Sequence, residues 1–198
     1  LQSLYLFLLI MTSRFQDLKI EDVTDQDIKD LGFFLLKWFK FKGIGNPFNY
    51  NRFMEFVQAN LLGYNLTKVG GGSDGINDQE ETTEFKGTEF NGFTKKGDER
   101  SHSFAYNGTT RKDTLEEQKK YCKAKIMRDP LHHWSMIDYE NGTFIKTIQL
   151  TNEQVWKVLW PKWEKSWYNS GAADPRIGAS ISTNDLKKAG IDYVTITH

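Results

Sequence analysis

The sequence predicts a mixed α/β (α+β) domain in which a central mixed sheet is flanked by helices. Apolar residues recur every three to four positions in several segments, as in amphipathic helices, while other segments alternate with the period of two that is typical of strands. Threonine, asparagine and glycine, which commonly begin or end helices, stand at the borders of the helical segments.

Two helices are predicted first. The first is expected over residues 24–41, where Thr24 is a favourable N-cap and apolar side chains recur at helical spacing. A second helix is expected from Asn46 to Gly63, with Pro47 at its first position, because proline suits the first turn of a helix.

Strand-like segments follow these helices. Residues 64–69 and 82–88 have β-type patterns and are separated by a glycine run and a polar turn at 77–79, which predicts a hairpin. Residues 91–112 are polar and contain glycine, so we expect a long loop there. A helix is predicted over residues 114–127.

The last third of the chain begins with a second hairpin, formed by residues 134–139 and 143–150. A helix is expected to start at Thr151, and Pro161 to kink or interrupt it. A glycine-rich connection and two short elements follow, a helix from Thr183 and a strand at 193–196.

The chain has 198 residues, enough for one domain with its own core. We expect a single domain over residues 11–198, with the core at about 46–150 and a C-terminal helical and loop part at 151–198. Residues 1–10 are almost wholly apolar but too few to span a bilayer. We interpret them as translated sequence ahead of a true start at Met11, or as a short element packing on the domain.

Cys122 is the only cysteine, which excludes an intramolecular disulfide and a cysteine zinc cluster. We expect it to be a packed thiol and not a catalytic one. This cysteine usage is typical of a reducing compartment, so we expect an intracellular, cytoplasmic protein without a membrane partner.

Charge is divided unevenly along the chain, although the formal net charge is zero. Residues 1–90 carry 9 basic against 13 acidic side chains, and residues 91–198 carry 17 against 13. Because phosphate contacts use Lys and Arg, a surface for nucleic acid is expected in the second half.

Chemistry is expected at Asp74, Glu84 and Lys86. Alternate side chains of a strand share a face, so Glu84 and Lys86 point together while Phe85 faces the core. Asp74 lies ten positions before Glu84, and a hairpin between them brings it beside Glu84 on the neighbouring strand. Such carboxylates hold Mg²⁺, and a nearby lysine can orient the water that attacks a phosphodiester.

This pattern resembles the PD-(D/E)xK nuclease superfamily, which includes most type II restriction endonucleases. The family has an Asp at the end of one strand and Glu-x-Lys on the next, which Asp74, Glu84 and Lys86 match residue by residue. Many members carry a Glu on the preceding helix, where Glu55 stands here. The resemblance covers about residues 46–150 and implies a restriction-endonuclease-like core.

The resemblance also implies roles: Mg²⁺ ligation by Asp74 and Glu84, assistance by Glu55, and positioning of the attacking water by Lys86. It implies double-stranded DNA as substrate, a 5′-phosphate product and often a homodimer that reads a palindrome. Ser73 departs from the pattern, which has proline there. The tripeptide Asp/Glu-x-Lys alone is weak evidence for a nuclease, because it occurs five times in this sequence. It begins at Asp17, Asp27, Glu84, Glu117 and Asp185.

Candidate DNA contacts lie on and before the helix at 114–127. Lys119 and Lys123 on this helix, with Arg111 and Lys112 ahead of it, either position a DNA backbone or form a solvated face. Gln118 is a further candidate for substrate contact, because some exonuclease-like members have Gln on this helix; the alternative is again a solvated face.

Other features also have two interpretations. Arg176 is a candidate for reading guanine from a loop at 169–182. Four tryptophans at helical spacing either stack on bases or, as we expect, pack in the core or a dimer interface; they are Trp156, Trp160, Trp163 and Trp167. His132 and His133 are adjacent on a strand and point to opposite faces, so they are not expected to share a metal ion.

The sequence therefore predicts a Mg²⁺-dependent endonuclease that hydrolyses double-stranded DNA, in particular a type II restriction enzyme of a restriction-modification system. One alternative is a repair or recombination nuclease of the same superfamily, which acts on DNA structure instead of sequence. Another is a non-catalytic DNA-binding module that carries Asp and Glu.

Overall fold

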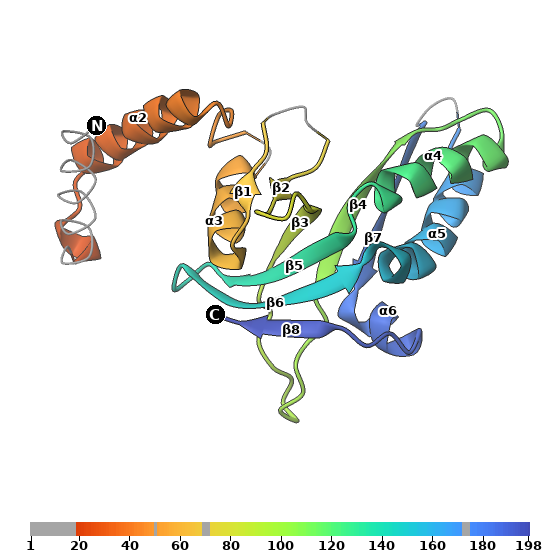
Figure 1. The fold of residues 1–198 in the computed structure, drawn as a ribbon. Coiled ribbons are helices and arrows are strands. Elements are labelled where there is room, and N and C mark those ends of the chain that lie inside the picture. The colour runs from red at the N-terminus through yellow and green to blue at the C-terminus, as the bar shows by residue number, and fades with distance from the viewer. Residues whose placement is uncertain (1–18, 50, 69–71, 172–174) are drawn as a thin grey trace. The chain divides into compact units, whose positions relative to one another are not determined.

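The computed structural model describes residues 19–49, 51–68, 72–171 and 175–198, and Figure 1 shows their arrangement. The chain divides into two compact units, residues 1–47 and residues 48–198. The described residues of the second unit form a six-stranded mixed sheet, a two-stranded sheet and four helices. This architecture confirms the predicted class, a mixed sheet flanked by helices. The proposed extension at residues 1–10 lies outside the described residues.

In residues 19–47, the described part of the first unit, the structure has one long helix, α2 (Asp25–Lys42), after a short 3-10 turn at Ile20–Asp22. Thr24 caps α2 in a reciprocal capping box with Asp27, and Gly43 ends it with a left-handed backbone. The helix predicted at 24–41 is therefore confirmed. Within the described parts of the chain, no helix is both long enough and apolar enough to cross a bilayer.

The six-stranded sheet of the second unit has the order β1-β2-β3-β5-β6-β8. Its strands are β1 (Asn65–Leu66), β2 (Gly75–Ile76), β3 (Thr82–Glu89), β5 (Leu131–Asp138), β6 (Thr143–Thr151) and β8 (Val194–Thr197). Neighbours are antiparallel except β3 and β5, which run parallel and need the long crossover that contains α4 (Leu115–Met127). The predicted hairpin of residues 134–139 and 143–150 and the final strand are present. A hairpin also turns near residues 77–79, but it joins β2 to β3; the strand predicted at 64–69 is found only as β1, which pairs with β2 and not with β3.

A second, two-stranded sheet pairs β4 (Ser103–Thr110) with β7 (Arg176–Ser182) in antiparallel fashion. The predictions of loops at 91–112 and 169–182 are therefore wrong over these strands. Phe104 and Tyr106 are buried and alternate with more exposed neighbours, so β4 has the period of a half-buried strand within a polar composition.

Two helix predictions also need correction. The second helix, α3 (Arg52–Leu62), starts later than Asn46, because Asn51 has a left-handed backbone (φ 64°) that cannot continue a helix. Pro161 does not interrupt α5 (Asn152–Asn169), which starts after Thr151 as predicted and keeps its buried face beyond the proline. The last helix is α6 (Thr183–Lys188).

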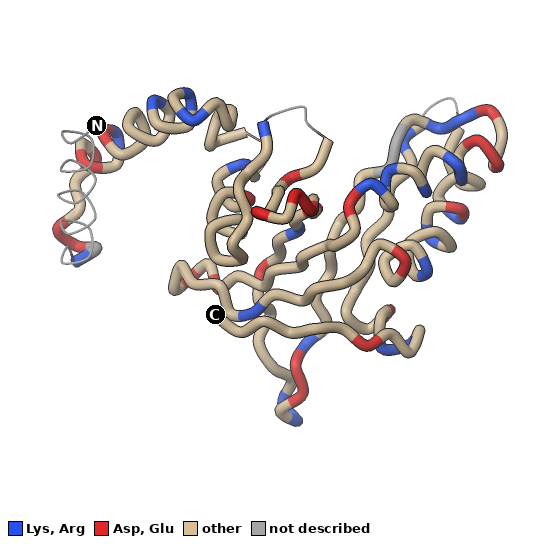
Figure 2. The backbone as a smooth tube through the Cα atoms, viewed as in Figure 1, with Lys and Arg blue, Asp and Glu red and all other residues tan. Residues whose placement is uncertain are grey.

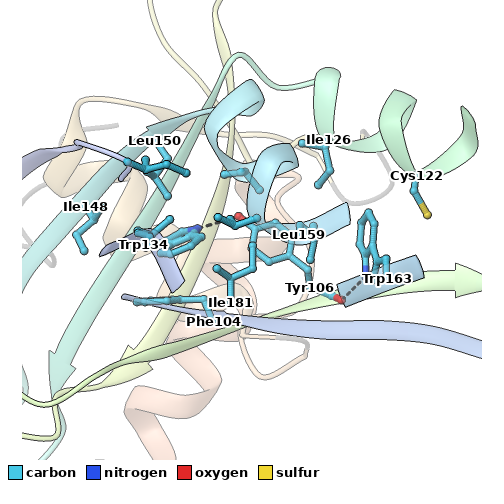
Figure 3. Packing of buried hydrophobic residues seen from close by; sticks show 14 of the residues in the cluster. Phe104, Tyr106, Cys122, Ile126, Trp134, Ile148, Leu150, Leu159, Trp163 and Ile181 are labelled. Atoms are coloured by element: carbon cyan, nitrogen blue, oxygen red, sulfur yellow. Dashed lines mark hydrogen bonds between the residues drawn. The ribbon is translucent and has the colours of Figure 1, made fainter. Parts of the chain in front are cut away.

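The hydrophobic core lies where the two-stranded sheet, β5, β6, α4 and α5 meet, as Figure 3 shows. Trp134 of β5 and Trp163 of α5 are fully buried, and the rings of Phe104 and Trp134 stack with centroids 4.6 Å apart. Because β5 is anchored in this core and also pairs with β3, the core fixes the position of the strand that carries Glu84 and Lys86.

Candidate active site

A polar cleft of about 310 Å³ lies among α3, β3 and β4. Its lining includes Glu55, Asp74, Glu84 and Lys86, the four catalytic residues predicted from the sequence. Asn107 of β4 also lines it, and sequence reasoning missed this residue because it falls in the segment expected to be a loop. The chain thus brings three carboxylates and one ammonium group into a single cavity.

Asp74 is fixed immediately before β2. Its backbone N–H donates to Thr83 O at 3.0 Å, and its carboxylate accepts a hydrogen bond from Phe85 N at 2.9 Å. Gly75 makes this approach feasible, since a Cβ there would lie only 2.8 Å from the Phe85 ring. The predicted hairpin therefore does set Asp74 beside β3.

The environment of Asp74 is unfavourable for a free carboxylate. Burial, followed by the nearby charge of Glu84, raises the pKa of Asp74 to about 7. Lys86 opposes this rise and Glu55 adds to it. The charges of Glu84 and Glu55 thus both oppose ionisation of Asp74, and a bound cation would relieve this repulsion.

Glu84 and Lys86 share one face of β3, as the pleat predicts. The Lys86 ammonium forms an ion pair with Glu84 Oε1 and donates to Phe85 O at 3.1 Å. Gln58 Nε2 donates to Lys86 O at 2.9 Å, which ties α3 to this strand. The lysine is thus held at the cleft by contacts from its own strand and from the preceding helix.

Tyr106 of β4 provides a buried platform for the lysine, whose Nζ lies 5.4 Å from the ring centroid. The Tyr106 hydroxyl accepts a hydrogen bond from Trp134 Nε1 at 2.8 Å and lies 3.0 Å from His132 Nδ1. His132 Nε2 faces Ile126 O at 3.3 Å and so carries the proton, which makes Nδ1 the acceptor. Burial raises the pKa of Tyr106 well above its usual value, so the phenol stays neutral.

The two adjacent histidines have separate structural partners. His132 contacts Tyr106, whereas His133 contacts Thr83 Oγ1 at 2.8 Å and Gln149 Oε1 at 3.3 Å. Burial lowers the pKa of both rings, His133 to about 4. Each histidine thus has its own hydrogen-bond partners within the fold.

Glu55 is oriented by Arg52 on the same helix, one turn earlier. Arg52 Nη1 donates to Glu55 Oε2 at 2.9 Å, and Arg52 Nη2 donates to Thr67 O. The arginine is largely buried, so the pair is shielded from solvent. Arg52 therefore links α3 to the segment just after β1, and sequence reasoning did not identify it.

Arg128 and Asp129, between α4 and β5, complete the charge network and were also missed by sequence reasoning. Arg128 Nη2 lies 3.2 Å from Glu84 Oε2, and its Nε and Nη2 donate to Asp129 Oδ2 at 2.9 and 2.7 Å. Both oxygens of Glu84 therefore already have a cationic partner, Lys86 on one and Arg128 on the other. No local sequence signal reveals this, because 44 positions separate Arg128 from Glu84.

The cleft offers carboxylate oxygens as donors for a metal ion. Among the described residues, no group of three or more His, Cys, Asp and Glu side chains is arranged to hold one. Mg²⁺ commonly uses only one or two protein carboxylates and completes its shell with water and substrate oxygens. Asp74 and Glu84, which share the cleft and repel each other, fit that smaller set.

The predicted DNA contacts on α4 divide into exposed and buried groups. Lys119 and Lys123 are exposed, and Lys119 Nζ lies 5.6 Å from the Trp160 ring centroid. Gln118 is fully buried; it accepts from Lys112 N at 2.7 Å and donates to Cys122 Sγ at 3.2 Å. Both interpretations of Gln118 required an exposed side chain and are therefore wrong, whereas the packed thiol is confirmed.

The remaining predicted contacts lie where β4 ends and β7 begins. Arg111 N donates to Pro175 O at 2.6 Å, and Thr110 pairs with Arg176. The Arg111 guanidinium lies 3.8 Å from the Trp167 ring centroid, so part of this group is occupied by packing. Lys112 Nζ similarly lies 4.6 Å from the ring of Tyr121. Figure 2 shows basic residues along this segment and α4.

The tryptophans of α5 also pack within the protein. Trp163 belongs to the core, and Trp156, Trp160 and Trp167 are partly buried against it. The rings of Trp156 and Trp160 stack on each other with centroids 5.2 Å apart. The expected packing role thus accounts for these side chains without nucleic acid.

Comparison with known proteins does not identify a function for the cleft. No protein-family model matches the chain, and no curated protein is significantly similar to it. The chemistry is therefore inferred from the residues in the cleft and from what they can bind.

Proposed function

We propose that this protein is a Mg²⁺-dependent endonuclease that hydrolyses phosphodiester bonds of double-stranded DNA, as a type II restriction enzyme does. The observation that carries the proposal is the convergence of Asp74, Glu84, Lys86 and Glu55 in one cleft. Glu55 on α3 and Glu84 with Lys86 on β3 support this proposal, because they follow the order of the PD-(D/E)xK pattern; Asp74 departs from it in lying immediately before β2 instead of at the end of a strand. A homodimer in the cytoplasm belongs to the same proposal.

Each residue of the cleft has a proposed role. Asp74 and Glu84 would hold the cation with help from Glu55, and the cation would stabilise negative charge and make a bound water more acidic. Lys86 positions the attacking water, whose oxygen bonds to phosphorus as the bond to the 3′ oxygen breaks. The water loses a proton to solvent and the 3′ oxygen gains one, which leaves a 5′-phosphate and a 3′-hydroxyl.

Exposed lysines on α4 support DNA as the substrate. Lys119 and Lys123 are exposed on α4, where they can contact backbone phosphates. Lys125 of the same helix donates to Asn107 O at 2.7 Å, and Asn107 lines the cleft. The basic helix and the cleft are therefore connected through a single residue of β4.

The proposal is tested by incubating the purified protein with a mapped plasmid and Mg²⁺, with EDTA as control. Discrete fragments are expected. Lys86→Ala is expected to reduce the cleavage rate by about 10²–10³-fold or more while DNA binding persists, because the water loses its positioning group. Lys95→Ala, at an exposed loop position, is the matched control and should cleave normally.

Other outcomes of this test identify the alternatives. Cleavage confined to branched or damaged DNA indicates a repair nuclease, and binding without Mg²⁺-dependent cleavage indicates a non-catalytic module. Cleavage by Lys86→Ala at the normal rate contradicts the role given to the lysine.

A further inference from the structure

Arg128 is a cation at the edge of the proposed active site that the mechanism above does not use. Its side chain is 34% exposed, and Nη2 contacts Glu84 Oε2 at 3.2 Å. It follows α4 directly and precedes β5, so both ends of its segment are held by regular structure. Its guanidinium therefore lies beside the cation ligands without belonging to the core.

Asp129 fixes the orientation of this guanidinium. The Asp129 side chain is fully buried, and its Oδ2 accepts from both Nε and Nη2 of Arg128, at 2.9 and 2.7 Å. A buried carboxylate needs such pairing, because leaving water costs several kcal/mol. Asp129 thus binds the guanidinium edge formed by Nε and Nη2. It does not bind the edge formed by Nη1 and Nη2.

Gly72 lets the backbone pass close to the Nη1 and Cδ side of this guanidinium, where a side chain would crowd it. A Cβ at Gly72 would lie 3.1 Å from Arg128 Nη1 and 3.5 Å from its Cδ, and Gly72 also has a left-handed backbone (φ 89°). Nη1 makes no hydrogen bond to the residues that the structure describes. Gly72 stands two positions before Asp74. This side of the guanidinium therefore lies against the segment that leads to the proposed cation ligand.

Glu84 cannot ligate a cation with both oxygens while it keeps both of its present partners. Lys86 occupies Oε1 and Arg128 occupies Oε2. Once Glu84 turns to a cation, Arg128 loses one partner but remains held by Asp129. An arginine held on one edge and open on the other is suited to an anion, because its planar fork matches two phosphate oxygens.

We propose that Arg128 is a catalytic residue that exchanges Glu84 for an oxygen of the scissile phosphate when Glu84 ligates the cation, with Asp129 as its positioning residue. This inference rests on the proposed nuclease function. If Arg128 only neutralised Glu84, its removal would leave the effect of Mg²⁺ on DNA affinity unchanged. With the exchange, Arg128 instead contributes affinity for DNA only when the cation is bound.

The first test measures binding of a fluorescein-labelled DNA duplex by anisotropy, in EDTA and in Mg²⁺, with Lys86→Ala present in every protein to prevent cleavage. Mg²⁺ is expected to strengthen binding by this parent. Adding Arg128→Gln or Asp129→Asn should reduce that gain by roughly tenfold or more, the effect of losing a charge-assisted hydrogen bond. Arg100→Gln, which removes an exposed arginine of the loop before β4, should retain the gain.

The second test measures Mg²⁺ affinity by calorimetry without DNA. Arg128→Gln is expected to bind Mg²⁺ several-fold more tightly, because Glu84 is no longer occupied by the guanidinium. Thermal unfolding of each variant shows whether it is folded, and Arg128→Lys repeats both tests with the charge retained but the fork removed. A normal binding gain in Arg128→Gln and Asp129→Asn overturns the inference and leaves the nuclease proposal intact. Failure of the parent to bind duplex, with no cleavage by the native sequence, overturns both.

Discussion

The hydrophobic core and the polar cleft of the second unit use buried side chains in opposite ways. Trp134 and Trp163 are fully buried, and the indole N–H of each has a hydrogen-bond acceptor on Tyr106. In the cleft, Asp74 is buried near two like charges and its pKa rises to about 7. The core therefore satisfies its polar groups, whereas the cleft retains charge repulsion that a cation or substrate can relieve.

Tyr106 connects the two regions. Its backbone O accepts from Trp163 Nε1 at 3.4 Å, while its ring lies under the Lys86 ammonium. Tyr106 thus faces the core and also supports the cleft. The comparison teaches that the unfavourable charges of this site are held in place by the packing beside them, as expected where function and stability conflict.

The largest expected effect comes from breaking the core. Trp163→Ala should lower the free energy of unfolding by about 3–5 kcal/mol, because it removes a fully buried indole and leaves a cavity. Urea denaturation measures this change. Trp156→Ala, at a partly buried position on the same helix, is the control and should cost less. An equal or larger loss at Trp156 contradicts the central place given to Trp163.

In the cleft, replacing a buried side chain is expected to stabilise the protein instead. Asp74→Asn keeps an acceptor for Phe85 N and removes the buried charge. Because the pKa of Asp74 is raised to about 7, the folded state binds a proton between about pH 4 and pH 7 that the unfolded state has released. Wild-type stability from this group is therefore lost as the pH rises through 7.

The advantage of Asp74→Asn in the free energy of unfolding should consequently grow between pH 5 and pH 8, by on the order of 1–3 kcal/mol without divalent cation. Thermal or urea unfolding at the two pH values measures it. Asp98→Asn, at an exposed loop position, should show no such trend. A pH-independent difference would mean that Asp74 is already ionised in the folded protein at pH 5.

The same carboxyl predicts the pH dependence of cation binding. A ligand must lose its proton before it binds a metal ion, so Mg²⁺ affinity should be about tenfold weaker at pH 6 than at pH 8. Calorimetry at both values tests this, and Asp74→Asn should weaken Mg²⁺ binding at both. Equal affinity of the native protein at pH 6 and pH 8 contradicts ligation by Asp74.

Local signals account for the elements that sequence reasoning predicted. Thr24, Thr114 and Thr151 each form a capping box with the residue three positions on, so each helix start is encoded within one turn. The β4–β7 sheet was missed because its partners lie far apart in the chain, as Phe104 and Ile181 do. The polar composition of residues 91–112 indicated a loop, although buried and exposed positions alternate within β4. Composition also carries no information about which distant segment pairs with β4.

The candidate site shows the same division between local and distant information. Glu84 and Lys86 could be predicted to share a face, because the pleat of one strand determines it. Arg128 and Tyr106 approach β3 from later segments, which only the packed fold reveals. Gln118 was misplaced because the face of a helix that becomes buried depends on its partner helix, here α5.

The smallest expected effect is at the exposed surface of α4. Lys123→Ala should weaken duplex binding only a few-fold, about 0.5–1 kcal/mol, since an exposed phosphate contact is one of several and is screened by salt. If Lys123 contacts phosphate, the slope of log affinity against log salt should also fall by about one. Lys187→Ala, on the exposed side of α6, is the matched control. An unchanged salt slope would assign Lys123 to a solvated helix face, because a lysine that releases no counterion makes no phosphate contact.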